Sequence, residues 1–231
     1  MRCVVPAVLA SVLLAGQSVS ADEKIEFKTL EEKVSYGLGL NVGRSISGQV
    51  EGLDLEKFFA GVTAAVNQKD PQLTPEELQT AFEAFQKKMA EKAAKQAEEN
   101  LEAARKFLLE NKKKPGVKTT KTGLQYLVLE EGSGATPTSD STVSTHYRGK
   151  LINGKVFDES YKGDAPAAGE RPVSFGVTQV IPGWTEALQL MKVGAKYRLF
   201  IRPDLAYGER APGSIPPNSL LIFDIQLISV K

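Results

Sequence analysis

The amino-terminal half of the chain repeats apolar residues at every third or fourth position, the spacing of one face of an α-helix. The first repeat follows Thr29-Leu30-Glu31-Glu32, a capping box in which the Thr29 hydroxyl accepts from the Glu32 amide while Glu32 reaches back. The apolar stripe of this helix comprises Val34, Leu38, Val42 and Ile46. A second helix is predicted between its cap, Asp54, and Asp70-Pro71, with apolar residues at Leu55, Phe58, Phe59, Val62 and Val66.

The third helix is the longest that the pattern predicts. Thr74-Pro75-Glu76-Glu77 supplies the cap, and apolar residues continue at helical spacing until Lys114-Pro115-Gly116 stops the helix. Its middle carries alanines among Lys, Gln and Glu, a composition that favours a solvent-exposed shaft over a core helix. A long continuous coiled coil is the competing interpretation, and the weak alanine centre argues against it.

After Gly116 the apolar spacing changes from helical to alternating, which is typical of β-strands. Asn153-Gly154 is a strong hairpin signal, and one short amphipathic helix is predicted from Ile181 to Met191. The predicted strands cover 124–129, 142–151, 156–158, 173–175, 196–201 and 220–230. These elements indicate an α+β fold: an antiparallel sheet wrapped on one short helix, preceded by an all-α domain and a long connecting helix.

The first 21 residues have the pattern of a cleaved signal peptide. A basic start at Arg2 precedes an apolar run from Val4 to Ala15, and Val19-Ser20-Ala21 provides small residues for cleavage. The run is short of the ~20 residues that cross a bilayer, and an uncleaved amino-terminal anchor is the alternative. The only cysteine, Cys3, lies inside this segment, so the mature chain is predicted to be cysteine-free, which suits an oxidising compartment.

Charge and residue usage exclude several kinds of site. With Arg2 removed, 28 basic residues face 28 acidic ones, which gives no electrostatic basis for binding nucleic acid. The single histidine, His146, lies in a predicted strand and is interpreted as an ordinary sheet residue. One histidine without cysteine makes a histidine-based metal site or a Ser/His/Asp triad improbable, and neither a metal nor a cofactor is predicted.

Aromatic and branched side chains gather near the turns of the second half. A hydrophobic core explains many of them, and Phe175 fits a core or a pocket equally well. Trp184 follows Pro182-Gly183 and Tyr207 lies in the loop Ala206-Tyr207-Gly208, where polar aromatic atoms can meet a ligand. These residues favour an apolar binding pocket with a few polar groups.

Six motifs in fixed order resemble the signatures of the FKBP immunophilins. They are Thr145-His146-Tyr147-Arg148-Gly149, Asn153-Gly154-Lys155-Val156-Phe157-Asp158, Val180-Ile181-Pro182-Gly183-Trp184, Ala206-Tyr207-Gly208, Ile215-Pro216-Pro217-Asn218 and Leu221-Ile222-Phe223-Asp224. The helical part, with Ser35-Tyr36-Gly37-Leu38-Gly39, is similar to the macrophage infectivity potentiator (Mip/FkpA-like) type. The resemblance implies a helical dimerisation domain at 22–73, a connecting helix at 74–114 and an isomerase domain at 118–231.

The implied activity is peptidyl-prolyl cis/trans isomerisation on unfolded or proline-containing polypeptides, without a cofactor. By resemblance, Asp158, Tyr207 and the Ile181 amide are the catalytic groups. The substrate-binding residues are Tyr147, Phe157, Val180, Trp184 as the pocket floor, Ile215 and Phe223. The resemblance also implies a homodimer, a periplasmic location with possible association with the outer membrane, and binding of rapamycin-type macrolides.

Some positions depart from the family pattern: Val173 and Ala211 replace a common aromatic and a common histidine, and Arg171 is only a guess for the basic residue that often accompanies the aspartate. Two other functions remain open. The domain could hold a peptide or a partner with incidental turnover, or the helical arm could itself contact a host or envelope protein.

Overall fold

The structure, a computed structural model, describes residues 25–46 and 52–231. The predicted signal peptide, with Cys3, lies outside the described residues. The chain divides into two compact units, one ending at Leu53 and the other running from Asp54 to Lys231. None of the helices in the described ranges combines the length and hydropathy that a membrane crossing requires.

Helix α1 (Leu30–Ile46) in the first unit begins at the predicted capping box. The Glu32 amide donates to Thr29 Oγ1 at 3.2 Å, and the Thr29 amide donates to Glu32 Oε2 at 3.1 Å. Among the described residues none of this helix is buried, and most of its apolar side chains, among them Leu38, are exposed. The helix is therefore fixed locally by its cap, while the part of the chain that the structure describes leaves its apolar stripe largely uncovered.

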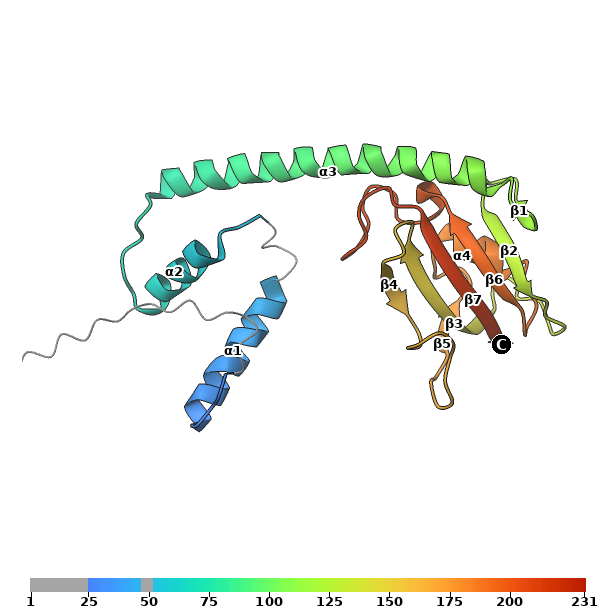
Figure 1. Cartoon of the computed structure of the whole chain (residues 1–231), viewed down its shortest axis with the longest axis horizontal. Helices are drawn as coiled ribbons and strands as arrows, with labels where there is room; N and C mark the ends of the chain where they lie inside the picture. The colour runs from blue at the N-terminus through green and yellow to red at the C-terminus, as the bar shows by residue number, and fades with distance from the viewer. Residues whose placement is uncertain (1–24, 47–51) are drawn as a thin grey trace, which may run out of the picture. The chain divides into compact units, whose positions relative to one another are not determined.

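In the second unit, α2 (Leu55–Val66) is capped by Asp54, whose side chain accepts from the Lys57 amide at 3.1 Å. Helix α3 (Pro75–Asn111) follows, with a full capping box between Thr74 and Glu77. Figure 1 shows α3 as one long uninterrupted helix, as its sequence predicts.

The remainder folds into a seven-stranded antiparallel sheet with the path β1-β2-β6-β7-β3-β4, to which β5 adds by pairing with β3. The strands are β1 (Val117–Thr119), β2 (Gln125–Glu130), β3 (Thr142–Leu151), β4 (Val156–Glu159), β5 (Val173–Gly176), β6 (Lys196–Ile201) and β7 (Leu221–Val230). The α+β prediction is confirmed. Strand β1 and the short 3₁₀ helix η1 (Pro203–Leu205) were not predicted.

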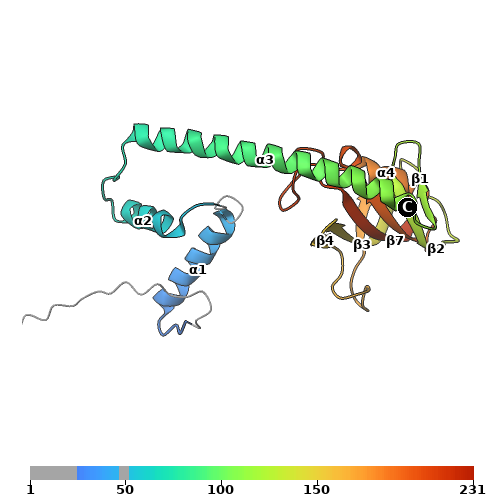
Figure 2. The same ribbon diagram turned by 45° about the horizontal axis from the view of Figure 1, so that its top comes forward.

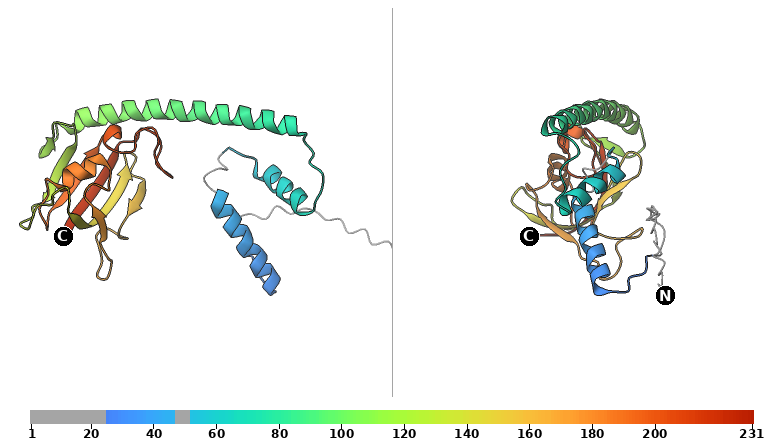
Figure 3. Two further views of the ribbon diagram at one scale, coloured as in Figure 1. Left: turned by 180° about the vertical axis from the view of Figure 1, so that it is seen from behind. Right: turned by 90° about the vertical axis from the view of Figure 1, so that its left-hand side faces the viewer.

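Alternation along β6 and β7 separates two faces of this sheet. Leu199 and Phe223 belong to the main core, which α4 (Pro182–Leu188) covers. Phe200 and Ile222 point the other way and pack with Ala104 of α3 in a second, smaller cluster. The view from behind shows α4 against the sheet (Figure 3), and Figures 1 and 2 both show the last turns of α3 running beside it.

The sequence pattern favours a solvent-exposed helix, but the last turns of α3 pack against the sheet. Ala104 and Asn111 are buried, and Phe107 and Leu108 pack on the smaller cluster. Asn111 Nδ2 donates to Gln125 Oε1 of β2 at 3.0 Å, and Gln125 Nε2 donates to Leu108 O at 2.9 Å. A small residue and an amide make this contact, so the hydrophobic pattern alone does not distinguish it from an exposed helix.

Candidate active site

A cavity of about 360 Å³ opens between α4, the β3–β4 hairpin and the loop after η1. Its lining combines aromatic rings with one carboxylate. The lining residues are Tyr147, Phe157, Asp158, Phe175, Gln179, Val180, Ile181, Trp184, Tyr207 and Phe223. Such a site suits a small apolar group held by a few polar contacts.

Trp184 forms the centre of the aromatic cluster and is only 4% exposed. Its ring meets Tyr147 at 5.2 Å between centroids with an interplanar angle of 82°, and Phe223 at 5.2 Å with 87°. These edge-to-face contacts hold the indole in one orientation. The rings thus form a rigid apolar base for the cavity.

The start of α4 places both Ile181 and Trp184. Ile181 is the residue before the helix, and its carbonyl accepts from the amides of Trp184 at 2.9 Å and Thr185 at 3.1 Å. Pro182 at the first helical position fixes the turn. A Cβ on Gly183 would lie 2.5 Å from Ile201 Cγ2, so glycine allows α4 to approach β6 closely. In the described part of the chain, the Ile181 N–H donates to no acceptor.

Asp158 at the end of β4 is exposed at the cavity rim and accepts a 2.8 Å hydrogen bond from the Tyr147 hydroxyl. Burial, together with this bond, raises the pKa of the Tyr147 phenol above its ordinary value. Burial and the nearby Asp158 charge also raise the pKa of Tyr207. Both phenols therefore remain protonated donors at neutral pH.

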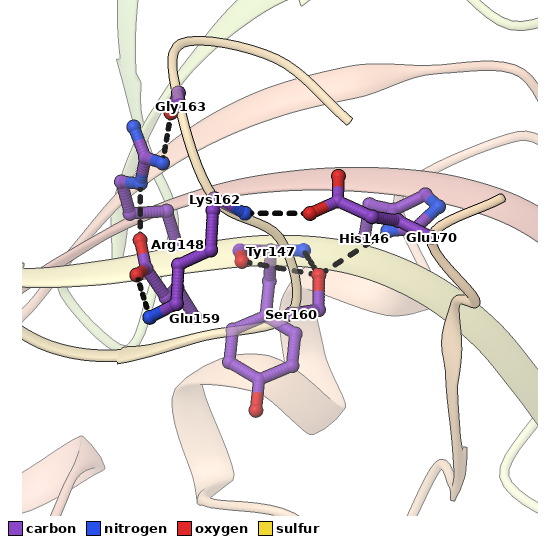
Figure 4. Close-up of polar contacts among 8 residues, drawn as sticks. All are labelled: His146, Tyr147, Arg148, Glu159, Ser160, Lys162, Gly163 and Glu170. Atoms are coloured by element: carbon purple, nitrogen blue, oxygen red, sulfur yellow. Dashed lines mark hydrogen bonds and ion pairs between the residues drawn. The ribbon is translucent and has the colours of Figure 1, made fainter. Parts of the chain in front are cut away.

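The loop after β4 is fastened behind Tyr147 (Figure 4). Ser160 Oγ accepts from the Tyr147 amide at 2.8 Å, and the Ser160 amide donates to Tyr147 O at 2.9 Å. Glu159 pairs with Arg148 at 2.9 Å and with Lys162 at 2.6 Å. Hydrogen bonding to Lys162 is the main reason that the pKa of Glu159 is lowered. The loop thereby ties β4, which carries Asp158, to β3.

His146 lies in β3 and is buried behind this loop. Its Nδ1 is 3.3 Å from Ser160 Oγ, and its ring meets Tyr161 edge-on at 6.1 Å. Arg171, guessed from sequence as the companion of Asp158, forms no ion pair with that residue in the described ranges. The role of Arg171 stays a prediction from the sequence. In the same ranges no group of three or more His, Cys, Asp or Glu side chains is arranged to hold a metal ion.

Eight of the nine residues singled out from the sequence line this cavity. The ninth, Ile215, is half-buried against the core and is not part of the lining. Phe175, which sequence left between core and pocket, lines the cavity and packs on Trp184 at 5.7 Å. Sequence reasoning missed Gln179, whose only signal was its position one residue before the Val180–Trp184 motif.

Two family models match successive parts of the chain. Residues 31–128 match the domain amino terminal to FKBP-type peptidyl-prolyl isomerase. Residues 134–228 match the FKBP-type peptidyl-prolyl cis-trans isomerase domain, which includes every cavity residue.

Individual relatives match over both parts. The peptidyl-prolyl cis-trans isomerase Mip of Coxiella burnetii is 41% identical, with 100% of this chain and 98% of the relative covered. The outer membrane protein MIP of Legionella longbeachae is 39% identical, with the same coverage. The crystal structure of FkpA from Escherichia coli matches with a TM-score of 0.61 and 37% identity, covering 89% of this chain and 99% of that one. With the cavity geometry, these matches show that the chain belongs to the Mip/FkpA-like FKBP-type peptidyl-prolyl cis-trans isomerases.

Proposed function

We propose that this isomerase catalyses rotation about Xaa-Pro peptide bonds in the aromatic cavity that contains Trp184. Asp158, Tyr207 and the Ile181 amide are its catalytic groups. One observation supports these roles most directly: a carboxylate, a phenol and a backbone N–H border one aromatic cavity. The proline ring enters over Trp184, between the rings of Tyr147, Phe157 and Phe223. Val180 contributes to the same wall, and Ile215 supports it from the core side.

The physical task is to twist an amide. The barrier of ~18–20 kcal/mol reflects the partial double bond, and uncatalysed exchange takes tens to hundreds of seconds. Twisting removes amide resonance and the charge separation that water stabilises. A cavity of aromatic rings therefore favours the twisted amide relative to the planar one, which is differential binding of the transition state. No covalent step is required.

The three polar groups act on different parts of the substrate. The Ile181 N–H, which has no acceptor among the described residues, donates to a substrate carbonyl and fixes the chain next to the proline. The Tyr207 hydroxyl, whose pKa is raised further above neutral by burial and by Asp158, donates to a second substrate carbonyl. The Asp158 carboxylate, oriented by Tyr147 at 2.8 Å, faces the twisting amide and interacts with its changed dipole.

The test is the cis-to-trans rate of a short prolyl peptide with the mature full-length protein. Asp158→Ala is expected to lower kcat/KM by roughly ten- to a hundredfold and Tyr207→Phe by about two- to tenfold, the ranges for losing a charged or a neutral polar contact. Asp140→Ala and Tyr126→Phe, which lie outside the cavity, are matched controls. A folded protein that leaves the rate unaccelerated favours the alternative, a peptide-binding module.

Rapamycin-type macrolides are the proposed inhibitors, because an apolar ring seated over Trp184 excludes proline from the same space. Rapamycin is expected to abolish acceleration and to change the fluorescence of Trp184, the only tryptophan in the chain. Val173 and Ala211 replace an aromatic and a histidine found in many family members. The dissociation constant of rapamycin is therefore the quantity to measure. A full rate at saturating rapamycin contradicts competition in this cavity.

We also propose a homodimer through the amino-terminal helices. Leu30 and Leu38 of α1 are 72% and 61% exposed, and the stripe continues at Val34 and Val42. A Cβ built on Gly37, Gly39 or Gly43 meets no atom of the described residues within 4 Å, so a second backbone can approach there. An apolar stripe of this kind is stabilised when another copy covers it.

Sedimentation of full-length protein tests this assembly. The parent is expected to be a dimer, and Leu38→Glu to shift it toward monomer because the charge would be buried unpaired in the interface. Lys33→Glu changes charge to the side of the stripe and serves as the control. A Leu38→Glu protein that sediments as the parent does would place the interface elsewhere.

A periplasmic folding helper is the role that fits these features. The predicted signal peptide directs export, and the Legionella longbeachae relative is named an outer membrane protein. Two cavities in a dimer hold one unfolded chain at two points, which raises effective concentration. Cell fractionation of the full-length precursor tests the location, with the periplasmic fraction as the expected result.

A further inference from the structure

Helix α3 makes one polar contact with the segment that leads away from the active site. Asn100 Nδ2 donates to Pro217 O at 2.8 Å, joining residues that are 117 positions apart. Gln96, one turn earlier, donates from Nε2 to Asn100 Oδ1 at 3.0 Å. With one end accepting and the other donating, the Asn100 carboxamide is held in a single orientation. Figures 1 and 2 both show the loop before β7 reaching the side of α3.

Pro217 lies near the end of a closed loop whose first residue follows Tyr207. The Asn218 amide donates to Gly208 O at 2.8 Å and closes the loop, while the Gly208 amide donates to Pro203 O at 2.9 Å. Ser219 Oγ donates to Pro216 O at 2.7 Å. Three consecutive residues at the end of the loop, 216–218, are therefore each held by a hydrogen bond, and Asn100 supplies the one that comes from outside the loop.

The anchor itself is rigid. One turn after Asn100, Ala104 is 1% exposed and packs against Phe200, Leu220 and Ile222. At the end of the helix, Asn111 bonds to Gln125. Because α3 is fixed to the sheet at Ala104 and again at Asn111, the position of Asn100 on this helix is set by the fold and does not depend on the loop.

We propose that Asn100 is a positioning residue for substrate selection, acting through Pro217 O on the loop 208–219. This inference rests on the proposed function, in which Tyr207 contacts substrate and Ile215 supports the wall. The loop starts beside Tyr207 and contains Ile215, so its position sets the space for the polypeptide that flanks the bound proline. Asn100 does not touch substrate. The connecting helix is thereby part of the specificity apparatus and not only a spacer.

The first measurement is a Michaelis analysis of full-length protein over peptides that differ in the residue before proline. Asn100→Leu, similar in size but without a donor, is expected to raise KM about three- to tenfold, the value of one lost hydrogen bond. Its kcat changes less than about twofold, because the Trp184 base is untouched. The ranking of peptides by kcat/KM is expected to become flatter.

Gln79→Leu is the matched control. Gln79 donates to Glu83 Oε1 at 2.9 Å, the same four-residue spacing as the Gln96–Asn100 bond, on an exposed part of the same helix. This variant is expected to keep the parent's KM and peptide ranking. An equal change in both variants would mean that helix stability, not the contact with Pro217, is responsible, and would overturn the proposal.

Amide hydrogen exchange gives a readout that is independent of catalysis. In Asn100→Leu the Asn218 amide is expected to exchange faster, whereas the Leu227 amide of β7, bonded at 2.9 Å to Ala195 O just before β6, keeps its rate. If Asn218 exchange is unchanged, Asn100 does not hold the loop and the inference fails even in an active enzyme. If Asn218 exchange rises while KM and ranking stay at parent values, Asn100 holds the loop without selecting substrate, and the inference again fails. If the parent itself is inactive, the proposed function fails instead.

Discussion

The ring of Phe223 occupies the space where a side chain on Gly149 would begin. A Cβ at Gly149 would lie 2.6 Å from Phe223 Cε1 and 2.7 Å from Phe157 Cζ. The two rings meet each other edge-on at 5.4 Å over this glycine. The glycine of the Thr145–Gly149 motif therefore permits two walls of the cavity to close over β3.

Gly149→Ala is expected to force these rings apart. Overpacking of this kind costs about 1–3 kcal/mol of unfolding free energy, and the displaced walls lower kcat/KM by roughly tenfold. Urea unfolding followed by Trp184 fluorescence, together with peptide exchange kinetics, measures both effects. Gly61→Ala in α2 is the control, since its Cβ meets no atom within 4 Å. Parent-like kinetics for Gly149→Ala would show that the walls relax without cost.

Local signals explain why so much of the fold could be predicted from sequence. The caps at Thr29, Asp54 and Thr74 each fix a helix start through one or two hydrogen bonds between near neighbours. Strand β3 was predicted with the bounds observed, because its alternation is long and its turn is Asn153-Gly154. Three-residue elements such as β1 carry too few positions for any period to be detected.

Contacts between distant segments were harder to predict. The packing of α3 against the sheet depends on Ala104 and Asn111, whose residue types are as common on an exposed helix as in an interface. The Ser160 and Asn100 contacts use ordinary polar residues that form no motif. Most of the cavity residues could be predicted because their motifs resemble those of a known family. Gln179 was identified only from the geometry of the cavity.

Stability is expected to fall at alkaline pH through Tyr147. Burial and Asp158 raise the pKa of this phenol in the folded protein, so the folded state keeps its proton after the unfolded state has lost it. The stabilising contribution is complete below the ordinary tyrosine pKa of about 10 and is lost as pH rises above it. Urea unfolding at a series of pH values from 7 upward is the measurement.

Tyr147→Phe isolates this contribution. At neutral pH the free energy of unfolding of this variant is expected to be about 0.5–1.5 kcal/mol lower than that of the parent, because the hydrogen bond to Asp158 is missing. At alkaline pH its free energy of unfolding is expected to decline less steeply than that of the parent. Tyr36→Phe on exposed α1 serves as the comparison and should follow the parent. Identical slopes for Tyr147→Phe and the parent would show that this phenol is not the source of the decline.

The buried Asn111–Gln125 pair is expected to hold the end of α3 to the sheet. Asn111→Asp keeps the shape but removes the donor, leaving Gln125 Oε1 beside a carboxylate. Loss of a buried hydrogen bond with unpaired partners costs about 1–3 kcal/mol, and more where a charge is buried. Urea unfolding measures the loss. Glu110→Gln, the exposed neighbour, is expected to change stability little, and an equally stable Asn111→Asp protein would contradict the assigned role.

Ser160 is expected to fix the position of Tyr147 in the cavity through its hydrogen bond to the Tyr147 backbone. Ser160→Ala leaves the Tyr147 amide without its 2.8 Å side-chain acceptor and loosens the loop that joins β4 to β3. Loss of one hydrogen bond in this position is expected to lower kcat/KM about two- to tenfold. It also speeds hydrogen exchange at the Tyr147 amide.

Ser144→Ala provides the matched comparison, because Ser144 lies on β3 and the variant loses a 2.8 Å hydroxyl bond, to Ser174 of β5, at an exposed position. Both variants remove one hydroxyl that takes part in a 2.8 Å hydrogen bond involving a β3 residue, but only Ser160 contacts the backbone of a cavity residue. A selective loss in Ser160→Ala therefore traces the effect to the placement of Tyr147 and, through its hydroxyl, of Asp158. Equal kinetics in the two variants would mean that β3 positions Tyr147 without help from the loop.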